Sequence, residues 1–279
     1  MTTTVDTITT TIAWPHHFGL THVPFTKTIA VEDLHSRDTH NEAVARIQHC
    51  IDQRSIGVIC GDVGAGKSVA MRAAANSLDR TKHVVIYLAN PAGGCRGIYV
   101  AVATALGATP RFHKAEAINQ TMSLLAAETN ERHRHVTFAI DEAHLLTPAQ
   151  LEELRLLTSS DMDSSSPFAL VLIGQPTLAL MLRQGVFAAL DQRITMRYTL
   201  APMTLTESIS YLNHHLALAG RTDPLIADDA AARLHRYANG IPRALNNAAT
   251  AALLAAAADQ QPIVDDTHAK KAIAELTRN

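Results

Sequence analysis

One stretch of sequence decides the fold of this chain: Gly61-Asp62-Val63-Gly64-Ala65-Gly66-Lys67-Ser68. It fits the pattern G-x-x-x-x-G-K-[ST], and it lies between the β-rich run Ile56–Cys60 and the helix-forming segment Ser68–Leu78. Glycines in such a turn let backbone N–H groups converge on phosphate oxygens. The lysine ammonium then reaches the β- and γ-phosphates, and the serine hydroxyl can bind Mg²⁺. The sequence therefore predicts a phosphate-binding loop, in which we include the next residue, Val69.

A second motif places two carboxylates side by side. The apolar run Val136–Ile140 is typical of a buried strand, and it ends at Asp141 and Glu142. Asp141 would orient Mg²⁺ and its water ligands, whereas Glu142 would polarise the water that attacks the γ-phosphate. A strand that simply ends in solvent is the alternative interpretation. Because Lys67 is also present, the sequence favours catalysis and predicts an enzyme that hydrolyses ATP with Mg²⁺.

Strands and helices alternate over the first 200 residues. The apolar strands carry no polar alternation, which is typical of a parallel sheet with helices on both faces. After about residue 200 the pattern is helical throughout, with start signals at Thr204, Asp228, Pro242 and Asp265 or Asp266. The predicted fold is therefore α/β, a P-loop parallel-sheet core with a C-terminal all-helical lid. The predicted domains are a flexible tail at 1–15, the core at 16–201 and the lid at 202–279.

Composition excludes several classes of protein. With 24 Lys+Arg against 26 Asp+Glu, the formal charge of −2 rules out a uniformly basic nucleic-acid binder and leaves room only for a local basic patch. The three cysteines form no CxxC pair, and the paired histidines have no cysteine or carboxylate at ligand spacing, so we expect no metal site from them. The most apolar stretch, Ala248–Ala258, is shorter than the roughly 20 residues that span a bilayer. We expect a cytoplasmic protein without a membrane segment.

With both motifs placed, the chain resembles the AAA+ ATPases from about Phe18 to Ala258. The resemblance implies that Gln175, in Ile173-Gly174-Gln175-Pro176, is the polar sensor that touches the γ-phosphate and the attacking water. An ordinary turn is the alternative there. It also implies that His40 and Asn41 border the adenine.

Two arginines have roles implied by the same resemblance. Arg193, in Leu190-Asp191-Gln192-Arg193-Ile194, resembles the arginine finger that a neighbouring subunit inserts to stabilise transition-state charge. Arg183 and Arg197 are its competitors. Arg243, in Gly240-Ile241-Pro242-Arg243, resembles the second sensor of the lid, although a surface arginine is the alternative.

The motifs are similar to those of one group within the AAA+ proteins. They are Phe18-Gly19-Leu20 with Pro24-Phe25, the run from Asp141 to Leu146, Gly174-Gln175-Pro176 and Gly240-Ile241-Pro242-Arg243. The group contains the A-type ATPases of general secretion and the ATPase subunits that serve DNA transposases. Secretion members usually continue into a membrane helix and a peptidoglycan-binding domain, and because this chain stops after the lid we expect the transposition function.

That function implies specific partners. An ATP-bound homo-oligomer, either a closed ring or a helical filament, would assemble on double-stranded DNA, mark target sites and recruit or activate a transposase. The alternative is a cytosolic ATPase of a general secretion or envelope assembly system, which would bind proteins and not DNA. A replication-type helicase loader and a signalling switch with negligible turnover are further alternatives.

A basic block supports contact with DNA. From Arg80 to Ala115 the chain contains no Asp or Glu, and its basic residues are Arg80, Lys82, Arg96, Arg111 and Lys114. Similar transposition ATPases reach the DNA backbone from this region, so we expect Arg96, Arg111 and Lys114 to make non-specific, salt-sensitive phosphate contacts. A solvated surface is the alternative.

Overall fold

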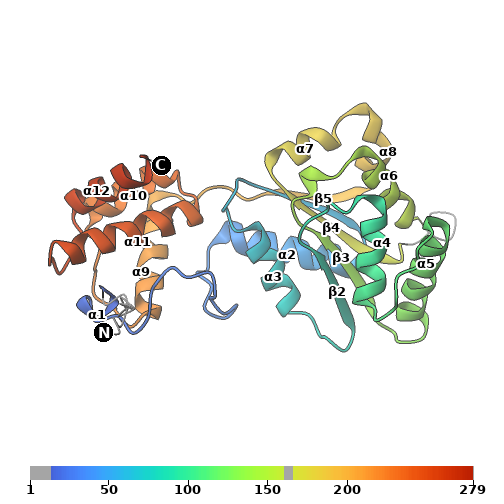
Figure 1. Cartoon of the computed structure of the whole chain (residues 1–279), viewed down its shortest axis with the longest axis horizontal. Coiled ribbons are helices and arrows are strands. Elements are labelled where there is room, and N and C mark those ends of the chain that lie inside the picture. Colours follow the sequence, from blue (N-terminus) through green and yellow to red (C-terminus); the bar gives the residue numbers. More distant parts are fainter. Residues whose placement is uncertain (1–13, 160–165, 279) are drawn as a thin grey trace, which may run out of the picture. The chain divides into compact units, whose positions relative to one another are not determined.

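The computed structural model describes residues 14–159 and 166–278, which form two compact units. One unit runs from Ser36 to Ala201 and contains the sheet. The other joins residues 202–278 to residues 14–35 and is helical. Figure 1 shows the strands and helices of each unit.

The sheet has five parallel strands in the order β2-β3-β4-β1-β5. Their bounds are β1 (Ile56–Cys60), β2 (His83–Leu88), β3 (His135–Ile140), β4 (Phe168–Gly174) and β5 (Ile194–Thr199). This confirms the predicted parallel α/β core. Because all strands run the same way, the segments that follow β1, β3 and β4 lie along one edge of the sheet.

Helices cover both faces of the sheet (Figure 1). One face packs against α2 (Asp38–Asp52) and α3 (Lys67–Asn76), with Ile59, Ala139 and Val171 pointing toward them. The alternate residues of the same strands face the other side, where the helices are α4 (Gly94–Ala105), α5 (Lys114–Asn130), α6 (Pro148–Leu157), α7 (Pro176–Leu182) and α8 (Ala188–Asp191). Among the described residues, the 3₁₀ turns η1 (Ala143–Leu145) and η3 (Gly185–Phe187) also belong to this layer. Burial on both faces explains why β1 and β4 are apolar throughout.

The helical unit packs small side chains around α11. Its helices are α9 (Leu205–Leu218), α10 (Asp228–Ala238), α11 (Pro242–Ala258) and α12 (Asp266–Leu276), with the short α1 (Trp14–His17) added from the N-terminal segment. Four alanines of α11 are fully buried, so neighbouring helices can approach it closely. The predicted all-helical C-terminal region is confirmed. Among the described residues, no helix is both long and apolar enough to cross a membrane.

The N-terminal segment differs from the prediction. We expected residues 16–201 to form one core, but residues 14–35 pack with the helical unit instead. Trp14, Phe18 and Leu20 are buried in its alanine-rich interior, and the Trp14 and Phe18 rings meet edge to face at 6.4 Å. Burial of these large apolar side chains explains the association. Trp14 and Pro15, which the prediction placed in the tail, lie in α1, and residues 1–13 lie outside the described residues.

Candidate nucleotide-binding site

The predicted phosphate loop joins β1 to α3 and depends on glycine conformations. Gly64 has φ +86° and Gly66, the residue before α3, has φ +101°, both in the region that favours glycine. The first N–H groups of α3 have no carbonyl partner within the helix, so they are available to an anion. The loop therefore has the backbone that a bound phosphate requires.

Lys67 is buried over this loop. Its Nζ donates to the backbone oxygens of Gly61 at 2.8 Å and Asp62 at 2.9 Å. Burial lowers the pKa of Lys67, while the carboxylates of Glu142 and Asp141 act in the opposite direction. The cation thus lies close to both carboxylates and is held by two neutral carbonyl oxygens, which phosphate oxygens could replace.

Ser68 and Asp141 come together although they are 73 positions apart. Ser68 Oγ donates to Asp141 Oδ2 at 2.5 Å, and the backbone N–H of Glu142 donates to Asp141 Oδ1 at 2.8 Å. The Asp141 side chain is buried, so its carboxylate is fixed in place. A hydroxyl and a carboxylate oxygen that converge on one point are ligands that suit Mg²⁺. These two residues therefore fit the predicted metal site.

Tyr87 is a member of the site that the sequence analysis missed. It lies on β2, beside β3, and its hydroxyl donates to Asp141 Oδ2. Burial, with the bond to Asp141 as the next cause, raises the pKa of Tyr87 to about 12, which keeps the phenol protonated as a donor. The available signal was a polar residue near the end of the strand before Asp141, but the neighbouring positions of β2 and β3 are not evident from sequence.

Glu142 has a different environment from Asp141. Its backbone is left-handed, with φ 51°, a conformation that costs energy for a residue with a side chain and often occurs at functional sites. Its side chain is 47% exposed, whereas Asp141 is buried. The two adjacent carboxylates are therefore divided between a fixed position and an accessible one, as their predicted roles require.

Gln175 lies next to these carboxylates because β4 lies between β1 and β3. It precedes α7, and its backbone N–H is directed at His144 Nδ1, 3.5 Å away. His144 Nδ1 is in turn 3.4 Å from Glu142 Oε2. His144 thus lies between the predicted sensor and the predicted water-activating residue.

The remaining predicted residues are more dispersed. His40 and Asn41 lie in the first turn of α2, where burial and Arg37 lower the pKa of His40 and where Asn41 Nδ2 donates to Ser36 Oγ. Arg193 follows α8, and its Nη1 donates to Ser159 Oγ at 2.5 Å. Arg243 is the second residue of α11 in the helical unit.

The two competitors of Arg193 have different environments. Arg197 Nη2 pairs with Asp191 Oδ1 at 2.6 Å. Arg183 follows α7 and is exposed.

In the basic block from Arg80 to Ala115, Lys114 forms an ion pair with a carboxylate. Lys114 Nζ pairs with Glu153 Oε2 at 2.8 Å, a carboxylate from α6 that the local sequence could not reveal. The guanidinium of Arg96 instead lies over the ring of Phe112, 5.3 Å from its centroid, and that ring is 74% exposed. Arg111 is also exposed. Of the three predicted DNA contacts, Arg96 and Arg111 are therefore better placed than Lys114.

Comparisons with known proteins agree with this geometry. Residues 49–182 match the family described as the AAA domain. The chain is also 33% identical over 244 residues to general secretion pathway protein A of Aeromonas hydrophila. That alignment covers 86% of this chain and 44% of the relative, so the chain spans less than half of the relative's length.

Solved structures with the same fold include proteins from archaea and bacteria. Cdc6p of Pyrobaculum aerophilum superposes with a TM-score of 0.70 at 16% identity, over 89% of this chain and 69% of that one. The ORC1 protein of Aeropyrum pernix in complex with DNA gives 0.66 at 17% identity, over 90% and 68%. The RuvB Holliday junction branch migration motor of Thermotoga maritima gives 0.56 at 17%, over 86% and 70%. These findings support an AAA+ ATPase, and the chain has the parallel-sheet P-loop fold of that class.

Proposed function

We propose that this protein hydrolyses ATP with Mg²⁺ at the edge of the sheet where β1, β3 and β4 end. The observation that carries the proposal is the convergence of a buried lysine, a serine hydroxyl and two carboxylates with different environments. Lys67 and Ser68 come from the loop after β1, and Asp141 and Glu142 from the end of β3. A glycine-rich turn alone would bind phosphate, but it would not activate water.

Each residue has a distinct role in the proposed reaction. Lys67 exchanges its two carbonyl partners for oxygens of the β- and γ-phosphates. Ser68 and Asp141 hold Mg²⁺, which neutralises charge on the phosphates. Glu142 accepts a hydrogen bond from the attacking water and Gln175 orients the γ-phosphate, while Arg193 of an adjoining subunit stabilises the transition state.

The direct test compares Glu142→Gln with the wild type. We expect steady-state phosphate release to fall about 10²- to 10⁴-fold, because an amide does not take a proton from water. Binding of a fluorescent ATP analogue should persist, since the phosphate cradle is untouched. Undiminished phosphate release by this variant would contradict the assignment of Glu142.

The arginine finger is tested by mixing subunits. Arg193→Ala and Lys67→Ala should each be inactive alone. Mixed oligomers should recover part of the activity, because a Lys67→Ala subunit can supply Arg193 to a neighbour with an intact loop. No recovery at any ratio would assign the finger to Arg183 or Arg197, or to a role within one subunit.

We further propose that the ATP-bound oligomer binds double-stranded DNA and regulates transposition through a transposase. The acid-free block, with exposed Arg111 and with Arg96 stacked on exposed Phe112, supports backbone contact. A gel shift of duplex DNA should need a non-hydrolysable ATP analogue and should weaken steeply with salt. Arg96→Ala with Arg111→Ala should weaken it further, whereas Lys114→Ala should have a smaller effect because Glu153 compensates that charge.

A secretion-type ATPase is the second candidate. It is favoured by the 33% identity to general secretion pathway protein A, a name that concerns the relative and not this chain. Such a protein would bind envelope or membrane proteins. Failure of the gel shift at low salt, with ATP hydrolysis intact, would favour this candidate over the DNA-dependent function.

A further inference from the structure

Among the described residues, His144 is the one histidine that contacts the proposed catalytic glutamate, and the proposed reaction does not use it. Its side chain is only 13% exposed, and it lies in η1 directly after β3. Its Nδ1 is 3.4 Å from Glu142 Oε2 and 3.5 Å from the backbone nitrogen of Gln175. One atom therefore faces both the residue that would activate water and the residue that would sense the γ-phosphate.

The close approach of these groups is built into the backbone. A Cβ added to Gly174 would lie 3.2 Å from the backbone nitrogen of His144 and 2.9 Å from Leu178 Cδ2. Glycine at the end of β4 thus lets α7 and η1 come close enough for the Gln175 N–H to reach the imidazole. On the other side, Glu142 has a left-handed backbone, and its side chain contacts the same ring.

The two contacts are mutually exclusive for chemical reasons. A backbone N–H only donates, and an ionised carboxylate only accepts. Nδ1 can therefore donate to Glu142 when it carries the proton, or accept from Gln175 when the proton is on Nε2. Both distances exceed the usual 2.7–3.2 Å of a hydrogen bond, as expected for a ring shared between two partners that compete for one nitrogen.

The ring has little charge around it on the elements that pack most closely against η1. These elements are β4 and α7, and neither of these fully described segments carries a titratable side chain. Glu142 faces the ring from its own loop, and Lys67 is a cation that interacts electrostatically with Glu142. The choice between the two partners is therefore set mainly by what Glu142 and Gln175 themselves contact.

We propose that His144 is a positioning residue that couples Glu142 to Gln175 and restrains Glu142 until nucleotide is bound. Without nucleotide, Nδ1–H donates to Glu142 Oε2 and keeps the carboxylate from the attacking water. When the water over the γ-phosphate becomes the donor to Glu142, the imidazole gives up its Nδ1 proton to solvent and takes one on Nε2. Nδ1 then accepts from Gln175, which fixes the sensor. This inference rests on the proposed ATP hydrolysis and deepens it.

Two variants separate the restraint from a packing role. His144→Leu fills similar space but neither donates nor accepts. His144→Asn keeps a donor and an acceptor and does not titrate. The exposed His49 on α2, changed to Leu, is the control for loss of a histidine elsewhere.

The measurement is kcat and KM for ATP at neutral pH. In the wild type, the hydrogen bond from Nδ1–H competes with the attacking water for Glu142, so it should lower kcat. In His144→Leu this restraint is absent, and kcat should exceed the wild-type value about threefold or more, with KM little changed. His144→Asn keeps a donor and should show no such gain, and His49→Leu should follow the wild type.

A second measurement does not depend on hydrolysis. Imidazole ¹⁵N resonances, with His144 identified by its loss in His144→Leu, distinguish the two tautomers. We expect the Nδ1–H form without nucleotide and the Nε2–H form with Mg²⁺ and a non-hydrolysable ATP analogue. The same tautomer in both samples would overturn the inference.

Other outcomes would also overturn it. If His144→Leu loses as much kcat as Glu142→Gln, the imidazole assists the chemistry and does not restrain it. If its kcat equals the wild-type value, or if only KM changes, the coupling to Glu142 is wrong. These results require an active wild type, so they differ from failure of the proposed function itself, in which the wild-type protein releases no phosphate and both proposals fall.

Discussion

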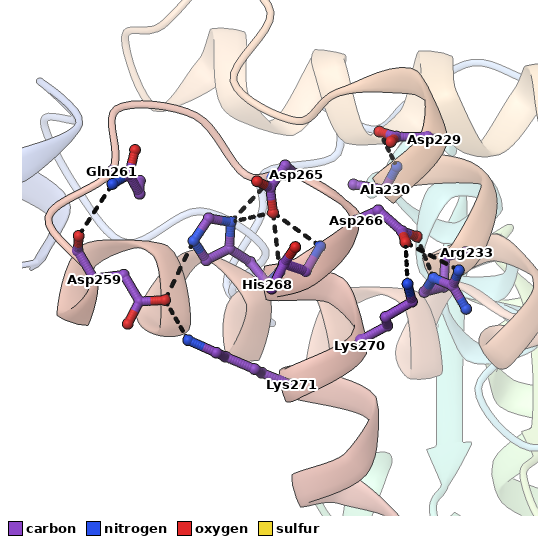
Figure 2. A network of polar contacts seen from close by, with 11 residues as sticks. Asp229, Ala230, Arg233, Asp259, Gln261, Asp265, Asp266, His268, Lys270 and Lys271 are labelled. Carbon is purple, nitrogen blue, oxygen red and sulfur yellow. Dashed lines mark hydrogen bonds and ion pairs between the residues drawn. The ribbon is translucent and has the colours of Figure 1, made fainter.

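The polar groups around α12 in the helical unit differ from Lys67 and Glu142 at the sheet edge in the partners that they have. In the helical unit, polar side chains form hydrogen bonds and ion pairs with one another, as Figure 2 shows around α12. Asp265 accepts from the backbone N–H groups of Thr267 and His268, and Asp266 pairs with Arg233 and Lys270. At the sheet edge, Lys67 donates to two carbonyl oxygens, and the Glu142 carboxylate lies 3.4 Å from a histidine nitrogen.

The difference separates groups that stabilise a fold from groups that await a ligand. Capping and surface ion pairs fix helix ends and contribute modestly, about 1 kcal/mol or less each. Among the described residues, Lys67 forms no ion pair with a carboxylate, so its burial carries a desolvation cost that a bound phosphate would offset. Substitutions in the sheet-edge site should therefore change activity, whereas those in the helical unit should change stability.

Lys67→Ala should change activity more than any other variant proposed here. It is the strongest test of the distinction between residues that serve activity and residues that serve stability. Phosphate release should fall about 10³-fold or more, because the cation that stabilises the phosphates is lost. The free energy of unfolding should stay the same or rise slightly, since a desolvated charge is removed. Phosphate release and thermal unfolding measured on the same preparation check both statements. A marked loss of stability would mean that Lys67 is part of the fold as well as of the site.

Gly240→Ala should have the opposite effect to Lys67→Ala, because it should lower stability rather than activity. Gly240 has φ +70°, and a Cβ there would lie 2.2 Å from the backbone oxygen of Met203, within the helical unit. We expect a loss of about 4 kcal/mol in unfolding free energy, because both the backbone conformation and the contact are unfavourable. Trp14, the single tryptophan, is buried in this unit, so its fluorescence reports the transition.

Gly97→Ala is the matched control for that substitution. Gly97 lies within α4, and an added Cβ would meet nothing within 4 Å. The change should stabilise the sheet unit by about 0.5–1 kcal/mol through helix propensity. An equal loss for both variants would show that the strain at Gly240 is not the cause.

His215 provides a pH-dependent test of the helical unit. Its side chain is buried against Phe25 and Tyr211, and burial lowers its pKa to about 4, with His214 and His35 as further causes. Because the folded pKa lies below the value of 6.5 for a free histidine, the unfolded chain binds the proton first. The stability from the neutral ring is complete above pH 6.5 and is lost as the pH falls from there toward 4.

The expected loss is about 3 kcal/mol between neutral pH and pH 4. Urea unfolding followed by Trp14 fluorescence at several pH values measures it. His215→Phe should remove most of this dependence, whereas the exposed His22→Phe should leave it. A wild-type transition that is independent of pH in this range would show that the ring is not neutral because of burial.

The sheet-edge chemistry was predictable because its signals are local. The loop from Gly61 to Ser68 and the pair Asp141-Glu142 each occupy a few consecutive residues, and both follow apolar strands. Parallel strands then bring such segments to one edge whatever the exact strand order. The contact of Tyr87 with Asp141 was not predictable, because it depends on β2 lying next to β3.

Other failures of prediction come from long-range contacts that override local patterns. The Thr39 and Glu42 spacing predicts a capping box, but α2 begins at Asp38, and Thr39 accepts from Arg37 Nε instead. Arg37 Nη2 also donates to the backbone oxygen of Ala201, so a residue 164 positions away helps to set where the helix begins. The association of residues 14–35 with the helical unit has the same origin.

Asp265→Ala should give the smallest effect, a small loss of stability in the helical unit. Its carboxylate accepts from the N–H groups of Thr267 and His268 and completes a capping box with the His268 side chain (Figure 2). Loss of this N-cap should cost about 1 kcal/mol, and Asp265→Asn should recover most of it, because the amide oxygen still accepts. ATP hydrolysis should not change in either variant. Since α12 shares its core with Trp14, the same fluorescence transition measures the loss, and an accompanying drop in kcat would show that polar groups of the helical unit also serve the nucleotide site.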